Sequence, residues 1–182
     1  MTKKPYSCVP DTLKHMKNVR YAIGLLRKKL VYRGKIHDRS KVEDPELEYF
    51  NKYTPMLAKI EYGSKEYQES IDNLKPALEH HYANNSHHPE HYPNGIADMD
   101  IIDLLEMFCD WNAASKRTKD GTMQKSIDVS CKRFNVDGLL KKIFENSVDI
   151  FEERRNNTEE NGIETCPNCT EMGCVICPTE DK

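Results

Sequence analysis

The sequence has no hydrophobic run close to the roughly 18 apolar residues that cross a membrane, and it shows no strand-like alternation of any length. Glycine (8 residues) and proline (9 residues) are too scarce among 182 residues for a fibrous or low-complexity chain. Neither charge dominates, because 27 Lys and Arg stand against 30 Asp and Glu; a basic nucleic-acid-binding face is therefore not expected. No apolar segment follows the first five residues, so we expect no secretory signal, no membrane association and a cytoplasmic protein.

Helical periodicity is present instead. Apolar residues recur every three or four positions along most of the chain, and helix-capping residues precede these segments. Residues 84–96 hold many turn formers and are predicted to form an ordered loop. We expect helices from Asp11 or Thr12 to near Gly34, from an Asp44 cap to Pro55, from Ser64 onward with a bend at Pro76, over about 99–117 after Asp98, after the Asp120-Gly121 turn, and from Asp137 onward.

The length suits one ordinary domain and a small appendage. We expect an all-α domain over residues 1–155, a charged, Asn-rich linker over 156–165 and a cysteine-rich segment over 166–177. The seven cysteines are an odd number. In a reducing compartment this suits metal ligands and buried thiols better than disulfides.

The cysteine-rich segment carries a C-x2-C-x4-C-x2-C pattern. The two Cys-x2-Cys pairs can present four thiolates to one tetrahedral Zn²⁺. The first three ligand positions are spaced as in a zinc knuckle, although the final gap is shorter. An iron–sulfur cluster is one alternative, and a reduced tail without metal is another. Acidic residues outnumber basic ones between positions 152 and 182, which argues against binding to nucleic acid. The predicted ligands are Cys166, Cys169, Cys174 and Cys177.

All seven histidines fall into three places, and five of them lie between positions 80 and 91. His15 lies on the apolar arc of the first predicted helix and is expected to point inward. His37 is followed by Asp38; adjacent helical residues diverge by about 100°, so both can reach one ion only at a helix end or bend.

The histidine-rich window contains better and poorer ligand candidates. On the helix that begins at Ser64, His81 lies on the apolar face and His80 points away. Imidazoles combined with carboxylates are the usual ligands of borderline divalent metals. The alternatives are a solvated polar loop or imidazoles packed beneath aromatic rings.

The helix predicted over 99–117 is apolar round most of its circumference, which indicates burial. Asp103, Glu106 and Asp110 nevertheless form one acidic stripe along it. Buried carboxylates need a metal or a basic partner. Arg117, on the same line two turns later, is the alternative to a metal.

The order of these residues resembles the HD superfamily of metal-dependent phosphohydrolases across residues 10–115. The pattern is a histidine, a His-Asp doublet, a histidine pair and an aspartate on a late helix. The segments HDRSK (37–41), HHYANNSHHPE (80–90) and DLLEMFCDW (103–111) are also similar to an uncharacterised domain family of bacteria and their phages.

The resemblance to the HD superfamily implies an all-α, HD-domain-like helical bundle with one or two divalent ions, drawn from Mn, Fe, Co, Mg and Zn. It implies that His15, His37, Asp38 and Asp110 hold the first ion, with Asp103 as the alternative to Asp110. The second ion would be held by His81 and His88.

A metal site of this kind predicts hydrolysis of a nucleotide or another small phosphorylated molecule by metal-activated water. Arg39, Lys41 and Arg133 are the cations that could bind phosphate oxygens. Glu79 or Glu106 could carry a proton or orient a ligating imidazole. The alternatives are an HD-type di-iron oxygenase and a non-catalytic, metal-stabilised interaction module in which the cysteine tail binds the partner.

Overall fold

The computed structural model describes residues 6–57, 64–117 and 120–151. Within these ranges the chain forms six α-helices and four short 3-10 helices, with no β-strand, which confirms the all-α prediction. No helix among the described residues has both the length and the apolar character that crossing a bilayer requires. The predicted linker and the four cysteines of the tail lie outside the described residues.

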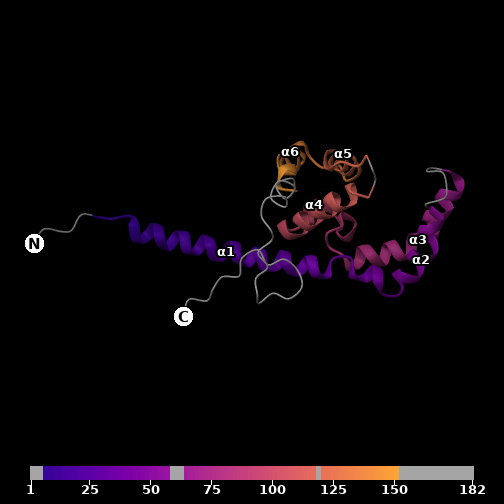
Figure 1. Ribbon diagram of the computed structural model, residues 1–182, viewed down its shortest axis with the longest axis horizontal. Coiled ribbons are helices and arrows are strands. Elements are labelled where there is room, and N and C mark those ends of the chain that lie inside the picture. Colours follow the sequence, from indigo (N-terminus) through magenta and orange to yellow (C-terminus); the bar gives the residue numbers. More distant parts are fainter. Residues whose placement is uncertain (1–5, 58–63, 118–119, 152–182) are drawn as a thin grey trace, which may run out of the picture.

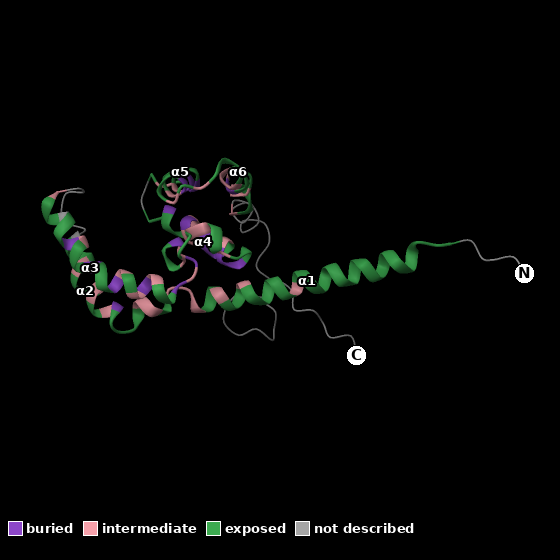
Figure 2. Ribbon diagram, turned by 180° about the vertical axis from the view of Figure 1, so that it is seen from behind, coloured by how far each residue is buried: buried purple, intermediate pink, exposed green. Residues whose placement is uncertain are grey.

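The long first helix, α1 (Val9–Ile36), leaves the rest of the molecule over its N-terminal half. It has 28 residues, none of them buried, and every residue from position 8 to 23 is exposed (Figure 1, Figure 2). The expected inward orientation of His15 is therefore wrong, because this half of α1 has no packing partner among the described residues. The helix also continues two residues past Gly34 before it ends.

The hydrophobic core lies between α4 (Ile101–Ser115), α5 (Met123–Arg133) and α6 (Gly138–Asn146). The phenyl rings of Phe108 and Phe144 stack with centroids 5.1 Å apart, and the Trp111 ring meets Phe144 edge-on. These three helices form a separate layer above α1 (Figure 1). The buried residues of the cluster are Met107, Phe108, Trp111, Met123, Ile127, Cys131 and Phe144.

The starts of these helices follow their capping residues. The carboxylate of Asp137 accepts a hydrogen bond from the Leu140 backbone N–H, and the Thr122 hydroxyl accepts one from Lys125. Asp100, rather than the predicted Asp98, caps α4 and forms a reciprocal capping box with Asp103. The predicted helix over 99–117 is thus shorter by two residues at each end.

The second and third helices pair with each other beside the end of α1: α2 (Glu46–Leu57) and α3 (Lys65–Asn84). Pro55 lies inside α2, so the prediction that it stops the helix is wrong. Its position in the last turn removes only one late backbone hydrogen bond. Pro76 lies inside α3, as predicted.

Two short 3-10 helices, η2 (Pro89–His91) and η3 (Gly95–Asp98), order the segment between α3 and α4. Gly95 has a φ of +59° in the left-handed region that favours glycine. The segment packs against α3, and the hydroxyl of Tyr92, which follows η2, donates a hydrogen bond to Asp103 of α4.

Candidate metal centre

The His37-Asp38 doublet lies where α1 ends and η1 (Arg39–Val42) begins. His37 is the C-cap residue of α1, and Asp38 has a φ of 55° in the left-handed region, which aspartate tolerates better than most residues. The break in the helix allows two adjacent side chains to face one centre. The doublet therefore sits at a helix end, one of the two geometries that the sequence allowed.

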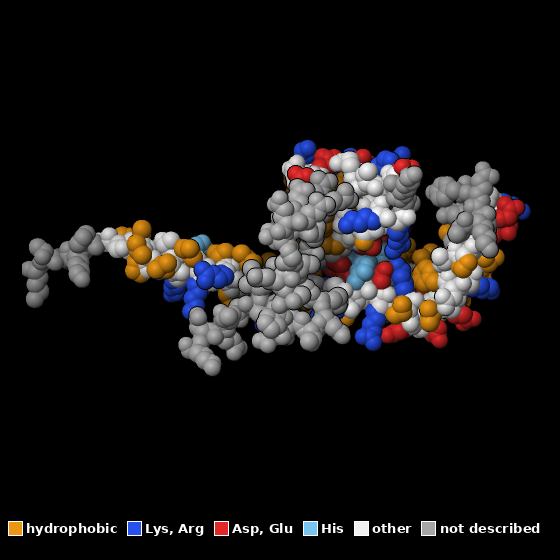
Figure 3. Space-filling model, viewed as in Figure 1, with side chains coloured by type: hydrophobic (Ala, Val, Ile, Leu, Met, Phe, Trp, Pro, Cys, Tyr) orange, Lys and Arg blue, Asp and Glu red, His pale blue; other side chains and the backbone are white. Residues whose placement is uncertain are grey.

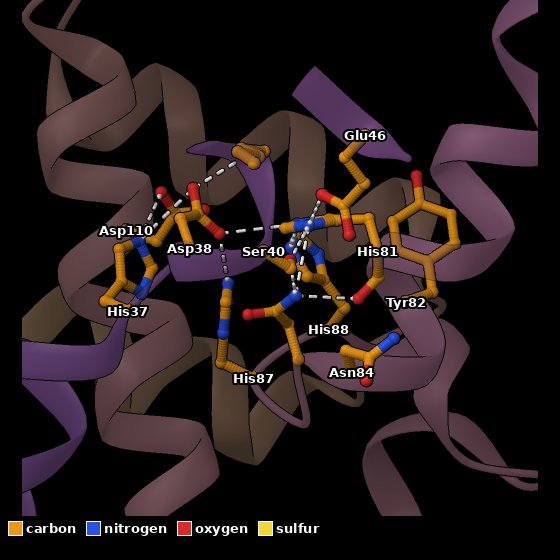
Figure 4. A network of polar contacts seen from close by, with 12 residues as sticks. His37, Asp38, Ser40, Glu46, His81, Tyr82, Asn84, His87, His88 and Asp110 are labelled. Atoms are coloured by element: carbon orange, nitrogen blue, oxygen red, sulfur yellow. Dashed lines mark hydrogen bonds and ion pairs between the residues drawn. The ribbon is translucent and has the colours of Figure 1, made fainter. Parts of the chain in front are cut away.

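Three further segments complete the cluster. The C-terminal turn of α3 supplies His81, the following loop supplies His87 and His88, and α4 supplies Glu106 and Asp110. These residues form three overlapping groups that could hold a metal ion, and Figure 4 labels every member except Glu106. The groups are Asp38 with His81, His87 and His88; His37 with His87 and Glu106; and His37 with Asp38 and Asp110.

Asp38 lies between the groups (Figure 4). Its Oδ1 atom is 3.3 Å from His81 Nε2 and 3.6 Å from His87 Nε2. On the other side, His37 Nε2 is 3.6 Å from Asp38 Oδ2 and 3.7 Å from Asp110 Oδ1. Two ligands bound at about 2.1 Å to one tetrahedral ion are roughly 3.4 Å apart, so these separations are those of ligands sharing an ion.

Glu106 fixes which ring nitrogens face Asp38. Its Oε1 atom lies 2.9 Å from His37 Nδ1 and 3.2 Å from His87 Nδ1. An ionised carboxylate can only accept hydrogen bonds, so both imidazoles donate from Nδ1. In the neutral form of each ring, Nε2 then carries the lone pair that a metal requires.

His81 and His88 form a second close pair of imidazoles. His81 Nε2 and His88 Nε2 are 2.9 Å apart. His81 is buried, with Nδ1 2.9 Å from Oε2 of the buried Glu46. His80, which is partly exposed and belongs to none of the three groups, binds the other oxygen of Glu46 at 2.8 Å.

Two buried atoms of the cluster have no hydrogen-bond partner: Asp38 Oδ1 and His87 Nε2. Both are lone-pair acceptors, and they lie 3.6 Å apart. Buried polar atoms without partners are costly, and two facing lone pairs repel each other. A cation between them removes both penalties, so the residues present fit a divalent metal ion.

The charges of the cluster are strongly coupled. Hydrogen bonds with Asp110 and Glu106 raise the pKa of His37 to about 9. Burial alone would raise the pKa of Glu106, but hydrogen bonds from His37 and His87 lower it to about 2. Burial, the largest cause, lowers the pKa of His88 to about 3.

The pKa values of the two aspartates are also lowered. Burial opposes this in both cases, but the Lys41 ammonium, 2.7 Å from Oδ2, holds the pKa of Asp38 well below its usual range. The hydrogen bond with His37 does the same for Asp110. Both carboxylates are therefore ionised at neutral pH and available as ligands.

The acidic stripe of α4 has a basic partner that the sequence did not indicate. Arg33 of α1 binds Asp103 Oδ1 at 2.9 Å and donates from Nε to Glu106. Asp103 also accepts hydrogen bonds from Ser86 and Tyr92. Arg117 is exposed, so the basic partner of the stripe is Arg33. The oxygens of Asp103 are occupied by protein donors, whereas Asp110 faces His37.

A pocket of about 250 Å³ opens behind the cluster, lined among others by Tyr32, Arg33, His87 and Glu106. Neither Asp38 nor Asp110 lines it. The pocket therefore meets the metal-binding groups at His87 and Glu106.

One face of the molecule shows histidine and acidic side chains in a hollow with Lys and Arg on its rim (Figure 3). Lys41 Nζ lies 2.7 Å from Asp38 Oδ2 and is one-third exposed. Arg133 is bound to Glu90, next to the loop that carries His88. Arg39 is 70% exposed and pairs with Glu43, so it is not part of the cluster.

Of the other residues predicted from the sequence, two lie away from the cluster. His15 is exposed on α1, about 33 Å along the helix from His37 at 1.5 Å per residue. Glu79 is exposed on α3. The structure brings together His37, Asp38, Lys41, His81, His88, Glu106 and Asp110; Cys166, Cys169, Cys174 and Cys177 lie beyond the described residues.

Sequence reasoning did not assign three residues that complete the cluster. His87 was inside the histidine-rich window but had no signal to separate it from its neighbours. Glu46 follows Pro45 in the first turn of α2 and reads as an ordinary acidic residue at a helix start. Arg33 lies on the same face of α1 as His37, four residues earlier, which is the signal that could have identified it.

One family model matches the chain. It is described as a family of unknown function, DUF5662, and it matches residues 4–156. No curated protein and no solved structure gives a match. Since the match covers most of the chain and all the residues of the cluster, the chain belongs to the DUF5662 family.

Proposed function

We propose that this protein is an HD-type, metal-dependent phosphohydrolase that acts on a nucleotide or another small phosphorylated molecule. The observation that carries the proposal is the convergence of ring nitrogens and carboxylate oxygens on Asp38, with two buried acceptor atoms left without partners. Such a site in a helical protein supports hydrolysis by metal-activated water.

The geometry supports two neighbouring ions that share Asp38. His37 Nε2, Asp38 and Asp110 would hold one. The other would be held by Asp38 Oδ1 with His81 and His88 or His87. In this assignment His87 enters the ligand set, whereas His15 does not.

The ions would lower the pKa of a bound water and neutralise phosphate charge. In hydrolysis the water oxygen bonds to phosphorus while the bond to the leaving group breaks, and the leaving oxygen takes up a proton. Lys41 lies beside Asp38 on the exposed face, so its ammonium can bind a phosphate oxygen. Arg133, which is bound to Glu90 two residues after His88, would contact a second phosphate or the rest of the substrate.

The test is phosphate release from a panel of nucleotides and sugar phosphates by the full chain, with Mn²⁺, Co²⁺ or Mg²⁺ added. Asp110→Asn keeps the shape of the side chain but removes one charged ligand, and we expect at least a 100-fold loss of activity. Asp149→Asn, an exposed substitution, serves as the control. If Asp110→Asn keeps the metal-dependent activity of the wild type, the proposal is contradicted.

A second candidate is an HD-type di-iron oxygenase. The group formed by Asp38 with His81, His87 and His88 is rich in nitrogen, and imidazole suits iron as well as manganese or zinc. Iron in the purified chain, together with substrate-dependent consumption of oxygen and no phosphate release, would favour this reaction over hydrolysis.

We also propose that the C-terminal cysteines bind Zn²⁺. The support is the C-x2-C-x4-C-x2-C spacing alone. Deletion of residues 157–182 separates the roles. An enzyme keeps its activity without the tail, whereas an interaction module loses its partner.

A further inference from the structure

We infer that Glu46 is a positioning residue that fixes the tautomer of His81 and thereby makes its Nε2 atom a metal ligand. This inference rests on the proposed metal centre. It concerns a side chain outside the three metal-binding groups, at the start of a different helix from any ligand.

The carboxylate of Glu46 is completely buried, with a side-chain exposure of 0%. Its Oε1 atom lies 2.8 Å from His80 Nδ1 and its Oε2 atom 2.9 Å from His81 Nδ1. A buried carboxylate has to be compensated by donors. An ionised carboxylate cannot donate in return, so both imidazoles carry their hydrogen on Nδ1.

Of the other polar groups around His81 Nδ1, Ser40 Oγ lies 3.3 Å away, farther than Glu46 Oε2 at 2.9 Å. The Asn85 amide nitrogen donates to Ser40 Oγ and to the His81 carbonyl oxygen, both at 2.8 Å. Its two hydrogens are then used. The contact of 3.0 Å between Asn85 Nδ2 and His81 Nδ1 is therefore no donation to the ring, and Glu46 remains the acceptor for the Nδ1 hydrogen.

This tautomer leaves His81 Nε2 as a lone pair. That atom points at Asp38 Oδ1, 3.3 Å away, and at His88 Nε2, 2.9 Å away. Without metal, His88 must donate its Nε2 hydrogen to His81. To hold an ion through Nε2, the neutral His88 ring would carry its single hydrogen on Nδ1 instead.

His80 completes the arrangement without being a ligand. Its side chain is 39% exposed, and its bond to Oε1 anchors the carboxylate that holds His81. The same arrangement occurs on the other side of Asp38, where Glu106 accepts hydrogen bonds from Nδ1 of His37 and of His87. Two buried carboxylates thus orient four imidazoles, three of which present Nε2 to Asp38.

The experiment compares Glu46→Gln with Glu48→Gln, an exposed residue two positions later on the same helix. The full chain is titrated with Co²⁺, and both the affinity and the visible absorption spectrum are recorded. Because an amide is a weaker acceptor than a carboxylate, we expect about tenfold weaker Co²⁺ binding and an altered spectrum in Glu46→Gln. Glu48→Gln should match the wild type in both.

A second measurement does not depend on how a variant folds. Long-range ¹H–¹⁵N correlation spectra of histidine-labelled, metal-free wild-type chain report the tautomer of each ring. The inference expects His81 with its hydrogen on Nδ1. A hydrogen on Nε2 would overturn it, as would Co²⁺ affinity and spectrum that are unchanged in Glu46→Gln. A wild-type chain that binds no Co²⁺ would instead contradict the proposed function.

Discussion

Asp38 joins the two halves of the candidate centre through a single carboxylate. One oxygen faces His81 and His87, and the other lies 3.6 Å from His37 Nε2 and 2.7 Å from Lys41 Nζ. The backbone of Asp38 has a left-handed φ of 55°. Asparagine tolerates the same backbone conformation, so Asp38→Asn changes the charge without demanding a new path for the chain.

At the residue scale, the first prediction concerns Lys41. Its ammonium contacts Asp38 but is not a metal ligand. Lys41→Ala should leave the metal content unchanged and raise the KM for a phosphorylated substrate by roughly 10- to 100-fold, the value of a lost charge-assisted hydrogen bond. Steady-state kinetics and metal analysis check this. Lys65→Ala, which is 87% exposed, is the control; equal KM values for the two variants would count against phosphate binding by Lys41.

The second prediction concerns pH. His37 has a pKa of about 9 in the metal-free protein, so it carries a proton at neutral pH that a metal must displace. His88, with a pKa near 3, is already neutral there. Mn²⁺ affinity should therefore rise about tenfold per pH unit from pH 6.5 and level off near pH 9.

Isothermal titration calorimetry with Mn²⁺ at several pH values measures this slope. Two buffers with different ionisation enthalpies give the number of protons released, which should include one from His37. If the affinity does not change between pH 6.5 and 9, His37 is not a protonated ligand of the centre.

At the element scale, α1 has two halves with different roles. Its last turn carries Arg33 and leads into His37, and both contact α4. The half before residue 24 is exposed throughout. His15→Ala should therefore change neither the Mn²⁺ stoichiometry nor the thermal midpoint, whereas His37→Ala should lose metal. A loss of metal in His15→Ala would show that this half of α1 folds back onto the centre.

The hydrophobic core lies between α4, α5 and α6, and substitutions on α5 test this assignment. Ile127 on α5 is 0% exposed, whereas Val129, two residues later, is 68% exposed. Ile127→Ala should lower the free energy of unfolding by about 2–5 kcal/mol. Val129→Ala should lower it by no more than about 0.5 kcal/mol. Urea unfolding followed by circular dichroism measures both, and equal effects would place the core elsewhere.

The elements themselves were largely predictable because their signals are local. Caps at Thr122 and Asp137 and the turn residues of 84–96 act within a few positions of the backbone they order. Periodicity, in contrast, says that a helix has an apolar face but not whether anything covers that face. This is why α1 was recognised as a helix while the inward orientation of His15 was wrong.

At the scale of the whole molecule, the centre is assembled from parts that are distant in sequence. Glu106 meets His37 across 69 positions and Arg33 across 73. The composition of the centre was readable, since the histidine window, the doublet and the acidic stripe were all visible. Its wiring was not. Which carboxylate binds metal and which orients an imidazole depends on tertiary contacts, and Glu46 gave no sign of its role before they were known.

The most direct test of the account is the number of Mn²⁺ ions bound per full-length chain, measured by elemental analysis after equilibrium dialysis. Mn²⁺ prefers oxygen and nitrogen ligands over thiolates, so the cysteine tail should not contribute. We predict two ions in the wild type and in the Asp149→Asn control. Asp38→Asn, which removes the shared carboxylate, should bind at most one. Wild-type chain without Mn²⁺, or Asp38→Asn with the full two ions, would contradict a metal centre built around Asp38.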